Sequence, residues 1–294
     1  MDPKLKYRKE NILWFNELKK EDIPFVGGKG ANLGELYDKF PVPRGFCITV
    51  NAYQRFMVRT MIEAKVHGML DRINVEDTEQ LEKTSKKIRD LILKQKFPTE
   101  LKQEIINNYE KLNNKKVAVR SSATAEDLPQ ASFAGQQDTY LDIEGNNNVI
   151  EAVQKCWASL FTARAIYYRE EKKFRHRDVL ICVVIQEMVD AEYAGVMFTV
   201  DPVNKKFILI EVVEGLGEKL VSGAVTPNTY FMNKKTHEIE QESGDMKFDR
   251  KILKNISKLG EKIEDHYKKP QDIEFAVDNK GKIFIVQSRP ITTL

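Results

Sequence analysis

Residues 117–141, VAVRSSATAEDLPQASFAGQQDTYL, hold the residues whose chemistry is most easily read from the sequence. A short β-branched run predicts a buried strand that carries Arg120 at its end. The residues from 121 to 139 are dense in Ser, Thr, Ala, Gly and Gln, which offer backbone N–H groups and hydroxyl donors. A fixed cation beside many donors suits a polyphosphate, so the stretch indicates phosphate binding. The alternative from composition is an ordinary polar surface loop.

A glycine-rich turn around Lys29 is a second candidate for anion binding. Gly27, Gly28 and Gly30 surround this lysine, and ANLGELY directly after them predicts the start of a helix. A flexible turn that leads into a helix N-terminus suits an anion. The spacing matches neither a P-loop nor the dinucleotide fingerprint, so a simple helix-entry turn is an equal alternative.

The last segment, QDIEFAVDNKGKIFIVQSRPI (271–291), predicts a β-hairpin. Its two halves alternate between apolar and polar residues, and Asp-Asn-Lys-Gly between them is a turn sequence. If Asp278 pairs with Gly281, then Glu274 lies opposite Ile285.

Polar side chains gather on one face of this predicted hairpin. Gln287 would be the diagonal neighbour of Glu274, and Arg289 follows two residues later on the same face. A carboxylate, an amide oxygen and a guanidinium suit a hard cation bound between protein oxygens and phosphates. A hairpin with one solvated face is the alternative.

Strands and helices alternate in the segments that must position these residues. The run at 179–189 is nearly continuous in Val and Ile, which predicts a strand covered on both faces. The other predicted strands are 12–18 at a sheet edge, 46–50, 194–202, 206–223 and 228–233, and the predicted helices lie within 60–112, 148–173 and 250–267.

The composition favours an ordinary globular protein with a sizeable core. The chain has 294 residues, of which 41% are hydrophobic and 31% charged, and this length predicts one large or two moderate domains. A net charge of +3 is too small to indicate nucleic acid as a partner. The absence of an apolar run of about 20 residues argues against a membrane span, and the N-terminus lacks a signal-peptide core.

Three cysteines, Cys47, Cys156 and Cys182, lie in apolar surroundings without a metal-ligand spacing. We therefore expect reduced core thiols and a cytoplasmic protein.

Six motifs, taken together and in order, carry a resemblance to a known family. They are GGKGANLGEL, VAVRSSATAEDLPQASFAGQQDTYL, CWASLFTARAIYYR, GVMFTVDP, GLGEKLVSGAVTPNTY and DIEFAVDNKGKIFIVQSRP. From about residue 12 to Pro290 the chain resembles the nucleotide-binding domain of the phosphoenolpyruvate synthase (pyruvate, water dikinase) family. Pyruvate phosphate dikinase and rifampin phosphotransferase are relatives. The resemblance implies an α+β ATP-grasp fold with ATP held between two lobes, at 1–185 and 186–294.

The residues to which the resemblance assigns roles fall into four groups. They are Lys29, Arg120 and Arg289 as catalytic phosphate contacts; Gly135 and Thr139 in a mobile loop that closes over the nucleotide; Gln186, Glu187, Met188 and Val189 along the adenine; and Glu274 and Gln287 as ligands of Mg²⁺.

The family's reaction needs a histidine that this chain does not offer in a recognisable form. In the family, ATP phosphorylates a histidine on a swivelling domain, which carries the phosphoryl group to a pyruvate-binding domain. None of His67, His176, His237 and His266 lies in a Gly/Thr-rich carrier segment, and His176 is expected to be a surface residue. We therefore expect the chain to be the ATP-binding part of a larger catalyst, with both other domains as its partners.

Two alternatives to the phosphoenolpyruvate synthase reaction remain. One keeps the half-reaction with ATP but has rifampin or a phenol as the final acceptor. The other is a nucleotide-binding module without catalysis, against which the complete set of charged site residues argues.

Overall fold

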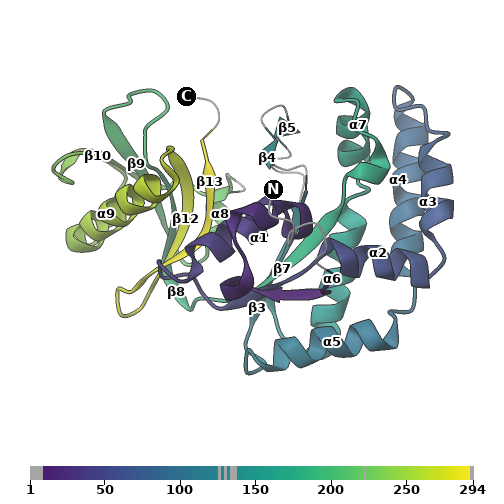
Figure 1. Cartoon of the computed structure of the whole chain (residues 1–294). Helices are drawn as coiled ribbons and strands as arrows, with labels where there is room; N and C mark the ends of the chain where they lie inside the picture. Colours follow the sequence, from purple (N-terminus) through teal and green to yellow (C-terminus); the bar gives the residue numbers. More distant parts are fainter. Residues whose placement is uncertain (1–8, 125–126, 129–130, 133–137, 222, 292–294) are drawn as a thin grey trace. The chain divides into compact units, whose positions relative to one another are not determined.

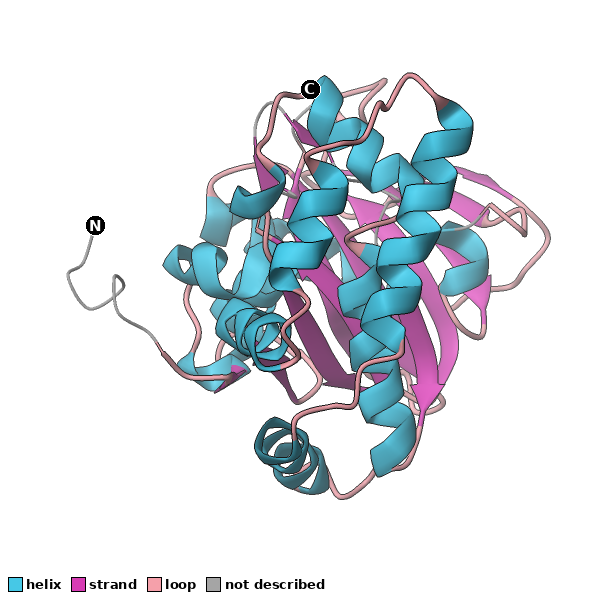
Figure 2. Cartoon of the chain, turned by 90° about the vertical axis from the view of Figure 1, so that its right-hand side faces the viewer, coloured by secondary structure: helices cyan, strands magenta, loops and turns pink. Residues whose placement is uncertain are grey.

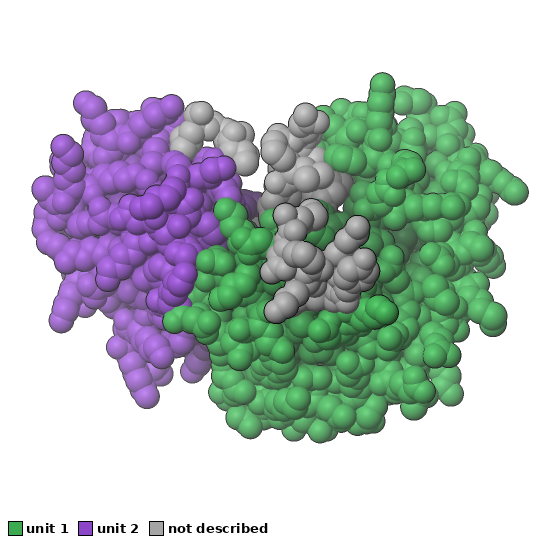
Figure 3. Space-filling view, in the orientation of Figure 1, with its two compact units in different colours: residues 1–38, 44–188 green, residues 39–43, 189–294 purple. Residues whose placement is uncertain are grey.

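Two antiparallel sheets, each with its own helices, organise the chain (Figure 1). The computed structural model describes residues 9–124, 127–128, 131–132, 138–221 and 223–291. The chain divides into a first unit of residues 1–38 and 44–188 and a second unit of residues 39–43 and 189–294 (Figure 3). The mixture of helix and sheet in both units confirms the predicted α+β class. The sequence-based boundary after residue 185 falls inside a strand of the first unit.

The sheet of the first unit has five strands, all antiparallel to their neighbours. In spatial order they are β1 (Ile12–Trp14), β2 (Gly45–Ile48), β7 (Ile181–Glu187), β3 (Val117–Ala123) and β6 (Thr139–Ile143). The edge position of β1 confirms that prediction. The central strand β7 is buried from Ile181 to Gln186, as a Val/Ile run covered on both faces requires. A separate two-stranded ladder joins β4 (Asp127–Leu128) and β5 (Ala131–Ser132).

Helices cover both faces of this sheet. They are α1 (Ile23–Tyr37), α2 (Val50–Arg59), α3 (Glu63–Leu70), α4 (Thr78–Leu93), α5 (Thr99–Glu110), α6 (Asn146–Ser159) and α7 (Ala163–Glu171). Val119 of β3 faces a core around the buried Trp157 of α6, whose ring lies 4.8 Å from that of Phe56. Arg120 and Ser122 of the same strand point to the opposite face, which α1 covers. Figure 2 views the helical layer with the strands behind it.

The predicted single helix over 148–173 is wrong. The chain forms α6 and α7 instead, with a break at residues 160–162. The side chain of Thr162 accepts a hydrogen bond from Ala165 N at 3.2 Å and so begins the second helix as its N-cap. The apolar stripe continues across the break, which is why periodicity alone missed it.

Strand β3 also differs from its prediction, because it continues beyond Arg120 to Ala123. Ser121 and Ser122 are fully buried strand residues rather than the start of a loop. Ser122 Oγ donates to Val26 O at 2.9 Å, so a small hydroxyl residue here serves close packing against α1.

The second unit contains a six-stranded sheet and two helices. In spatial order the strands are β11 (Ile239–Ser243), β10 (Asn228–Asn233), β9 (Phe207–Glu214), β8 (Ala191–Phe198), β12 (Gln271–Asp278) and β13 (Ile283–Pro290), and the helices are α8 (Glu218–Val221) and α9 (Arg250–Tyr267). Gly260 lets α9 approach Met197 closely, since a Cβ there would lie 2.5 Å from Met197 Cε. The helix therefore covers the face that carries the buried alternate residues, such as Ile210 and Ile273.

The hairpin of β12 and β13 has a different register from the predicted one. Glu274 pairs with Gln287 directly, and the register shifts before Phe275 pairs with Ile285. The register is already shifted by one residue at the turn, where Val277 pairs with Ile283. The β-bulge inserts one further residue into β13, and the two shifts together make the predicted diagonal neighbours a direct cross-strand pair.

A short strap, residues 39–43, leaves the first unit and packs in the second. Pro41 O accepts a hydrogen bond from Ile285 N of the edge strand β13 at 2.9 Å. The ring of Phe40 lies 6.0 Å from that of His266 on α9. Within the described residues, no helix is long and apolar enough to cross a bilayer.

Candidate functional site

Lys29 lies directly after a break in helix α1. Gly27 has φ 66° and ψ 176°, which interrupts the helical conformation before Lys29. A Cβ on Gly27 would lie 2.3 Å from Ser122 Oγ, so only glycine lets α1 approach β3 this closely. The break thus fixes the turn that carries Lys29 against the sheet.

Arg120, Thr139 and Gln186 share the sheet face that α1 covers. Arg120 pairs directly with Thr139 of β6, and Gln186 of β7 pairs with Ala118, two residues before Arg120. Directly paired residues point to one face, so the three side chains are neighbours. Arg120 is 8% exposed, whereas Thr139 is open to solvent. The structure therefore brings together three of the predicted site residues in the first unit, including Gln186, which had been predicted for the second lobe.

Gln186 presents an unusual buried amide. The side chain is 2% exposed, and its Nε2 has no hydrogen-bond partner among the described residues. A buried donor without an acceptor costs about 1–3 kcal/mol, so such groups often mark a ligand contact. The family resemblance had implied a role for Gln186, but only the structure shows the unmet donor.

Glu187 points to the opposite face from Gln186, because side chains alternate along β7. Its carboxylate forms ion pairs with Arg44 at 3.6 Å and Lys115 at 3.5 Å. The N–H groups of Glu187 and Met188 donate to Arg44 O and Lys116 O within the same unit. Because these two N–H groups are already used, an adenine contact from this segment would depend on its carbonyl groups and on Val189. Val189 is the first residue of the second unit's long segment.

In the second unit, Glu274 and Gln287 are direct neighbours on the sheet face opposite α9. Val196 pairs with Glu274 on the other side, and Glu211 pairs with Val196, which adds a second carboxylate to this row. Burial raises the pKa of Glu211. Sequence reasoning missed Glu211, although its alternation with Ile210 and Val212 could have placed it on this face.

Arg289 pairs with Asp272, a residue that the sequence analysis did not name. Arg289 Nε and Nη2 each lie 2.8 Å from Asp272 Oδ2. Burial raises the pKa of Asp272, while the Arg289 charge lowers it and the Glu274 carboxylate raises it further. Asp272 precedes Glu274 by two residues, so strand alternation was the signal that could have revealed it.

Glu274 and Gln287 are the candidate metal ligands at this hairpin. No group of three or more His, Cys, Asp or Glu residues suited to a metal occurs in the described part of the chain. Glu274 and Gln287 offer a carboxylate and an amide oxygen side by side, the donor types that Mg²⁺ prefers. Phosphate oxygens and water usually complete such a site, so the residues fit Mg²⁺ bound together with a nucleotide.

The remaining predictions concern the loop and the thiols. Gly135 lies outside the described residues, as does most of the predicted loop that would close over the nucleotide. Cys47, Cys156 and Cys182 are free and buried, as expected. Burial raises the pKa of Cys182 well above its usual value, and the Lys29 charge opposes that rise.

Comparison with known protein families identifies the family of the chain that carries these site residues. The pattern of the "Pyruvate phosphate dikinase, AMP/ATP-binding domain" family matches residues 23–251 and 240–294. The chain belongs to this family. Membership confirms the predicted resemblance and the prediction of a nucleotide-binding domain.

Similar proteins are longer than this chain. A probable phosphoenolpyruvate synthase of Archaeoglobus fulgidus is 49% identical over 96% of the chain and 42% of its own length. A rifampicin phosphotransferase of Bacillus cereus is 40% identical over 96% of the chain and 36% of its own length. The chain thus spans less than half of these two relatives. Among solved structures, a dinucleotide-forming acetyl-coenzyme A synthetase 1 of Ca. Korarchaeum cryptofilum has a TM-score of 0.38 at 12% identity over 65% of this chain and 81% of its own.

Proposed function

We propose that the chain binds Mg-ATP as an ATP-grasp domain and transfers a phosphoryl group to a histidine on a separate domain or subunit. The observation that carries the proposal is the Glu274–Gln287 pair next to the Asp272–Arg289 ion pair, in a member of an AMP/ATP-binding family. The overall reaction converts pyruvate, ATP and water to phosphoenolpyruvate, AMP and phosphate. The identity to the Archaeoglobus fulgidus relative supports this choice.

Residues of the first unit hold the phosphates and the base in this proposal. Lys29 and Arg120 are cations that stabilise the negative charge spreading over the phosphates during transfer. Gly135, from the predicted loop, and Thr139, the first residue of β6 rather than a loop residue, contact the nucleotide. The Nε2 group of Gln186, which has no partner among the described residues, donates a hydrogen bond to the adenine, and the segment Glu187–Val189 contributes backbone groups.

Residues of the second unit bind the metal and a phosphate. Glu274 and Gln287 would hold Mg²⁺, which would supply positive charge that offsets the negative charge of the phosphates. Arg289, oriented by Asp272, donates to a phosphate oxygen.

The histidine acceptor is supplied by a phosphocarrier domain, and a pyruvate-binding domain completes the catalyst. The chain's own histidines are poor candidates: His237 is 8% exposed, and His176 accepts a hydrogen bond from the buried Arg169. The identity to the rifampicin phosphotransferase favours a second candidate in which only the final acceptor differs. Three free buried thiols are consistent with the reducing cytoplasm as its location.

A reconstitution tests the transfer. The chain is mixed with Mg-ATP and with the part of the Archaeoglobus fulgidus relative that lies outside its match to this chain. We expect AMP and an acid-labile phosphohistidine on the added part, and Arg120→Ala should abolish both. Lys65→Gln, at an exposed position on α3, is the matched control. Formation of ADP alone would contradict the proposed reaction, and nucleotide binding without phosphohistidine would favour a module without catalysis.

A further inference from the structure

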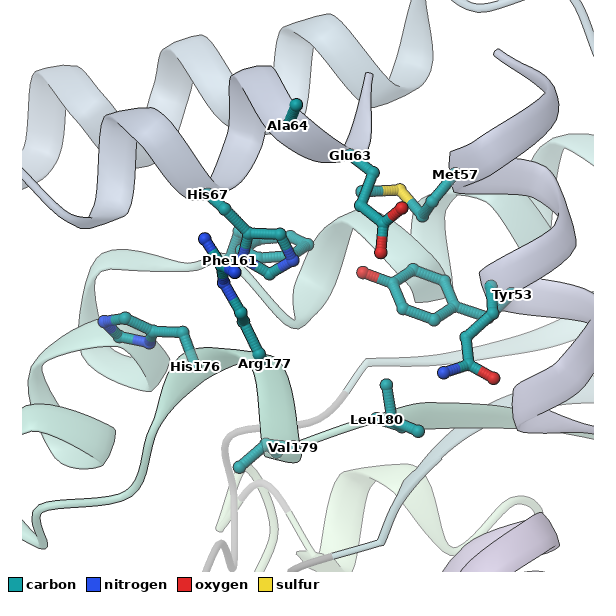
Figure 4. A pocket seen from close by; sticks show the side chains of 11 residues that line it. Tyr53, Met57, Glu63, Ala64, His67, Phe161, His176, Arg177, Val179 and Leu180 are labelled. Atoms are coloured by element: carbon teal, nitrogen blue, oxygen red, sulfur yellow. The ribbon is translucent and has the colours of Figure 1, made fainter. Parts of the chain in front are cut away.

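The first unit contains a cavity that the proposed function does not use. It has a volume of about 340 Å³ and lies between α2, α3, the α6–α7 link and the segment before β7 (Figure 4). None of the described residues predicted to bind the nucleotide lines it. Ligand pockets span about 300–1,000 Å³, so this one suits a small molecule.

One side of the cavity is cationic. Figure 4 shows the His67 ring and the Arg177 guanidinium together beside Phe161. Burial lowers the pKa of His67 and the Arg177 charge lowers it further, so the imidazole is mainly neutral at neutral pH. Arg177 Nη2 lies 3.5 Å from Asp71 Oδ2, but both side chains are largely exposed and such pairs are weak. The other guanidinium donors remain suited to a bidentate carboxylate.

A buried network fixes the turn that carries Arg177. Arg169, which is 1% exposed, donates from Nε to His176 Nδ1 at 3.0 Å and from Nη1 to Leu160 O at 2.7 Å. Because Nδ1 accepts, the ring proton of His176 is on Nε2, which lies 2.7 Å from Glu170 Oε1. The backbone that carries Arg177 is therefore held in place before a ligand binds, which lowers the cost of binding.

The opposite side of the cavity is acidic. In Figure 4 the Tyr53 hydroxyl points into the cavity near the Glu63 carboxylate. Burial raises the pKa of Tyr53, and the Glu63 charge adds to that rise. The same carboxylate opposes the lowering of the His67 pKa, so it acts on both sides of the cavity. A carboxylate here favours an ammonium group and repels a purely anionic ligand.

We propose that this cavity binds a small zwitterion of the α-amino-acid type with an apolar side chain. Its carboxylate lies against Arg177 and His67, and its ammonium group lies against Glu63. The apolar side chain packs on Phe161 and Met57, which are uncharged lining residues. Opposite charges on the two sides of the cavity match the opposite ends of such a molecule.

Calorimetric titration of the whole chain with L-leucine, L-methionine and L-phenylalanine tests the proposal. We expect binding of at least one, with Arg177→Gln and Glu63→Gln each weakening it about tenfold, as expected for loss of a hydrogen bond to a charged group. Lys65→Gln, on α3 but outside the cavity, should leave the affinity unchanged. Arg177→Lys keeps the positive charge but cannot donate two parallel hydrogen bonds to a carboxylate. It replaces Arg177→Gln if that variant has a much lower melting temperature.

Analogues with one charge separate this site from a merely apolar cavity. 3-Phenylpropionate lacks the ammonium group and 2-phenylethylamine lacks the carboxylate, so both should bind at least tenfold more weakly than L-phenylalanine. The proposal is overturned if no amino acid binds in the millimolar range, or if either analogue binds as tightly as L-phenylalanine. Displacement by Mg-ATP would also overturn it, because the amino acid would then occupy the nucleotide site.

Discussion

Asp272 accepts a hydrogen bond from the guanidinium of Arg289 at 2.8 Å. The sequence analysis did not predict Asp272 as a site residue. Asp272→Asn keeps the shape of this side chain but removes its charge. We expect phosphohistidine formation to slow by on the order of ten- to a hundredfold, because a small displacement of a catalytic group is costly. Folding stability should change by less than about 1 kcal/mol, since burial opposes the ionised form of Asp272.

Single-turnover rates and urea melts measure these two effects separately. The control is Asp265→Asn, which removes an exposed carboxylate from α9. An unchanged transfer rate in Asp272→Asn would show that Arg289 is oriented without its partner.

His176 makes the stability of the first unit depend on pH. Burial lowers the pKa of this imidazole to about 4 from 6.5, and the Arg169 charge adds to the shift. Between these values the unfolded chain binds more protons than the folded chain, so stability is full above pH 6.5 and falls toward pH 4. His176→Asn keeps an acceptor for Arg169 but does not titrate, and it should flatten this fall. Thermal melts from pH 4 to 7.5 measure the slope, and equal slopes in both proteins would refute the assignment.

At the scale of an element, Gly27 determines how α1 meets the sheet. Gly27→Ala places a Cβ 2.3 Å from Ser122 Oγ and 2.6 Å from its carbonyl oxygen, at a positive φ. We expect a loss of about 2 kcal/mol or more, together with weaker Mg-ATP binding, because α1 must move and carry Lys29 with it.

Gly68→Ala is the matched substitution in α3, where a Cβ meets nothing within 4 Å. It should gain roughly 0.5–1 kcal/mol, because alanine favours a helix interior more than glycine does. Denaturant unfolding of the two variants decides the point. Equal effects would mean that the contact of Gly27 with Ser122 is unimportant.

Local sequence rules predicted some elements to the residue and failed at others for identifiable reasons. Helix α9 matches its prediction, since Asp249 caps its start and Lys268 ends it in the left-handed conformation. The register of β12 and β13 differs from its prediction already at the turn, where Val277 pairs with Ile283, and the bulge between Glu274 and Phe275 shifts it by one more residue. A bulge inside the strands leaves no signal in the turn sequence. Thr162 was a readable cap within the apolar stripe that hid the break between α6 and α7.

The candidate site was predictable by residue type but not by orientation. Lys29, Arg120 and Glu274 stood out because charged residues rarely fill a core. Strand alternation predicts that Gln186 and Glu187 point to opposite faces, but which of them shares a face with Arg120 depends on the pairing of β7 with β3. The unmet amide of Gln186 depends on tertiary packing. Neither of these two properties is encoded in a local pattern.

For the whole molecule, binding of Mg-ATP should add to the free energy of unfolding. At a concentration one hundred times the Kd, the gain is about 2.7 kcal/mol for a ligand that binds only the folded chain. EDTA should remove most of this gain. In Glu274→Ala with Mg²⁺, ATP should stabilise the fold as little as it stabilises the unaltered chain in EDTA. Scanning calorimetry measures both. Full stabilisation by ATP in the presence of EDTA would contradict a metal at Glu274 and Gln287.

The strap at residues 39–43 means that the second unit is assembled from two distant pieces of chain. During synthesis, this short piece leaves the ribosome long before residues 189–294, so the early segment must wait for the edge strand on which it packs. Pro41 and Pro43 have no N–H, and Pro41 O takes the hydrogen bond of Ile285 on the edge strand β13. A fragment of residues 189–294 would bare that edge, and exposed edges recruit other strands. Such a fragment should aggregate through β13, and a peptide of the strap should restore its solubility.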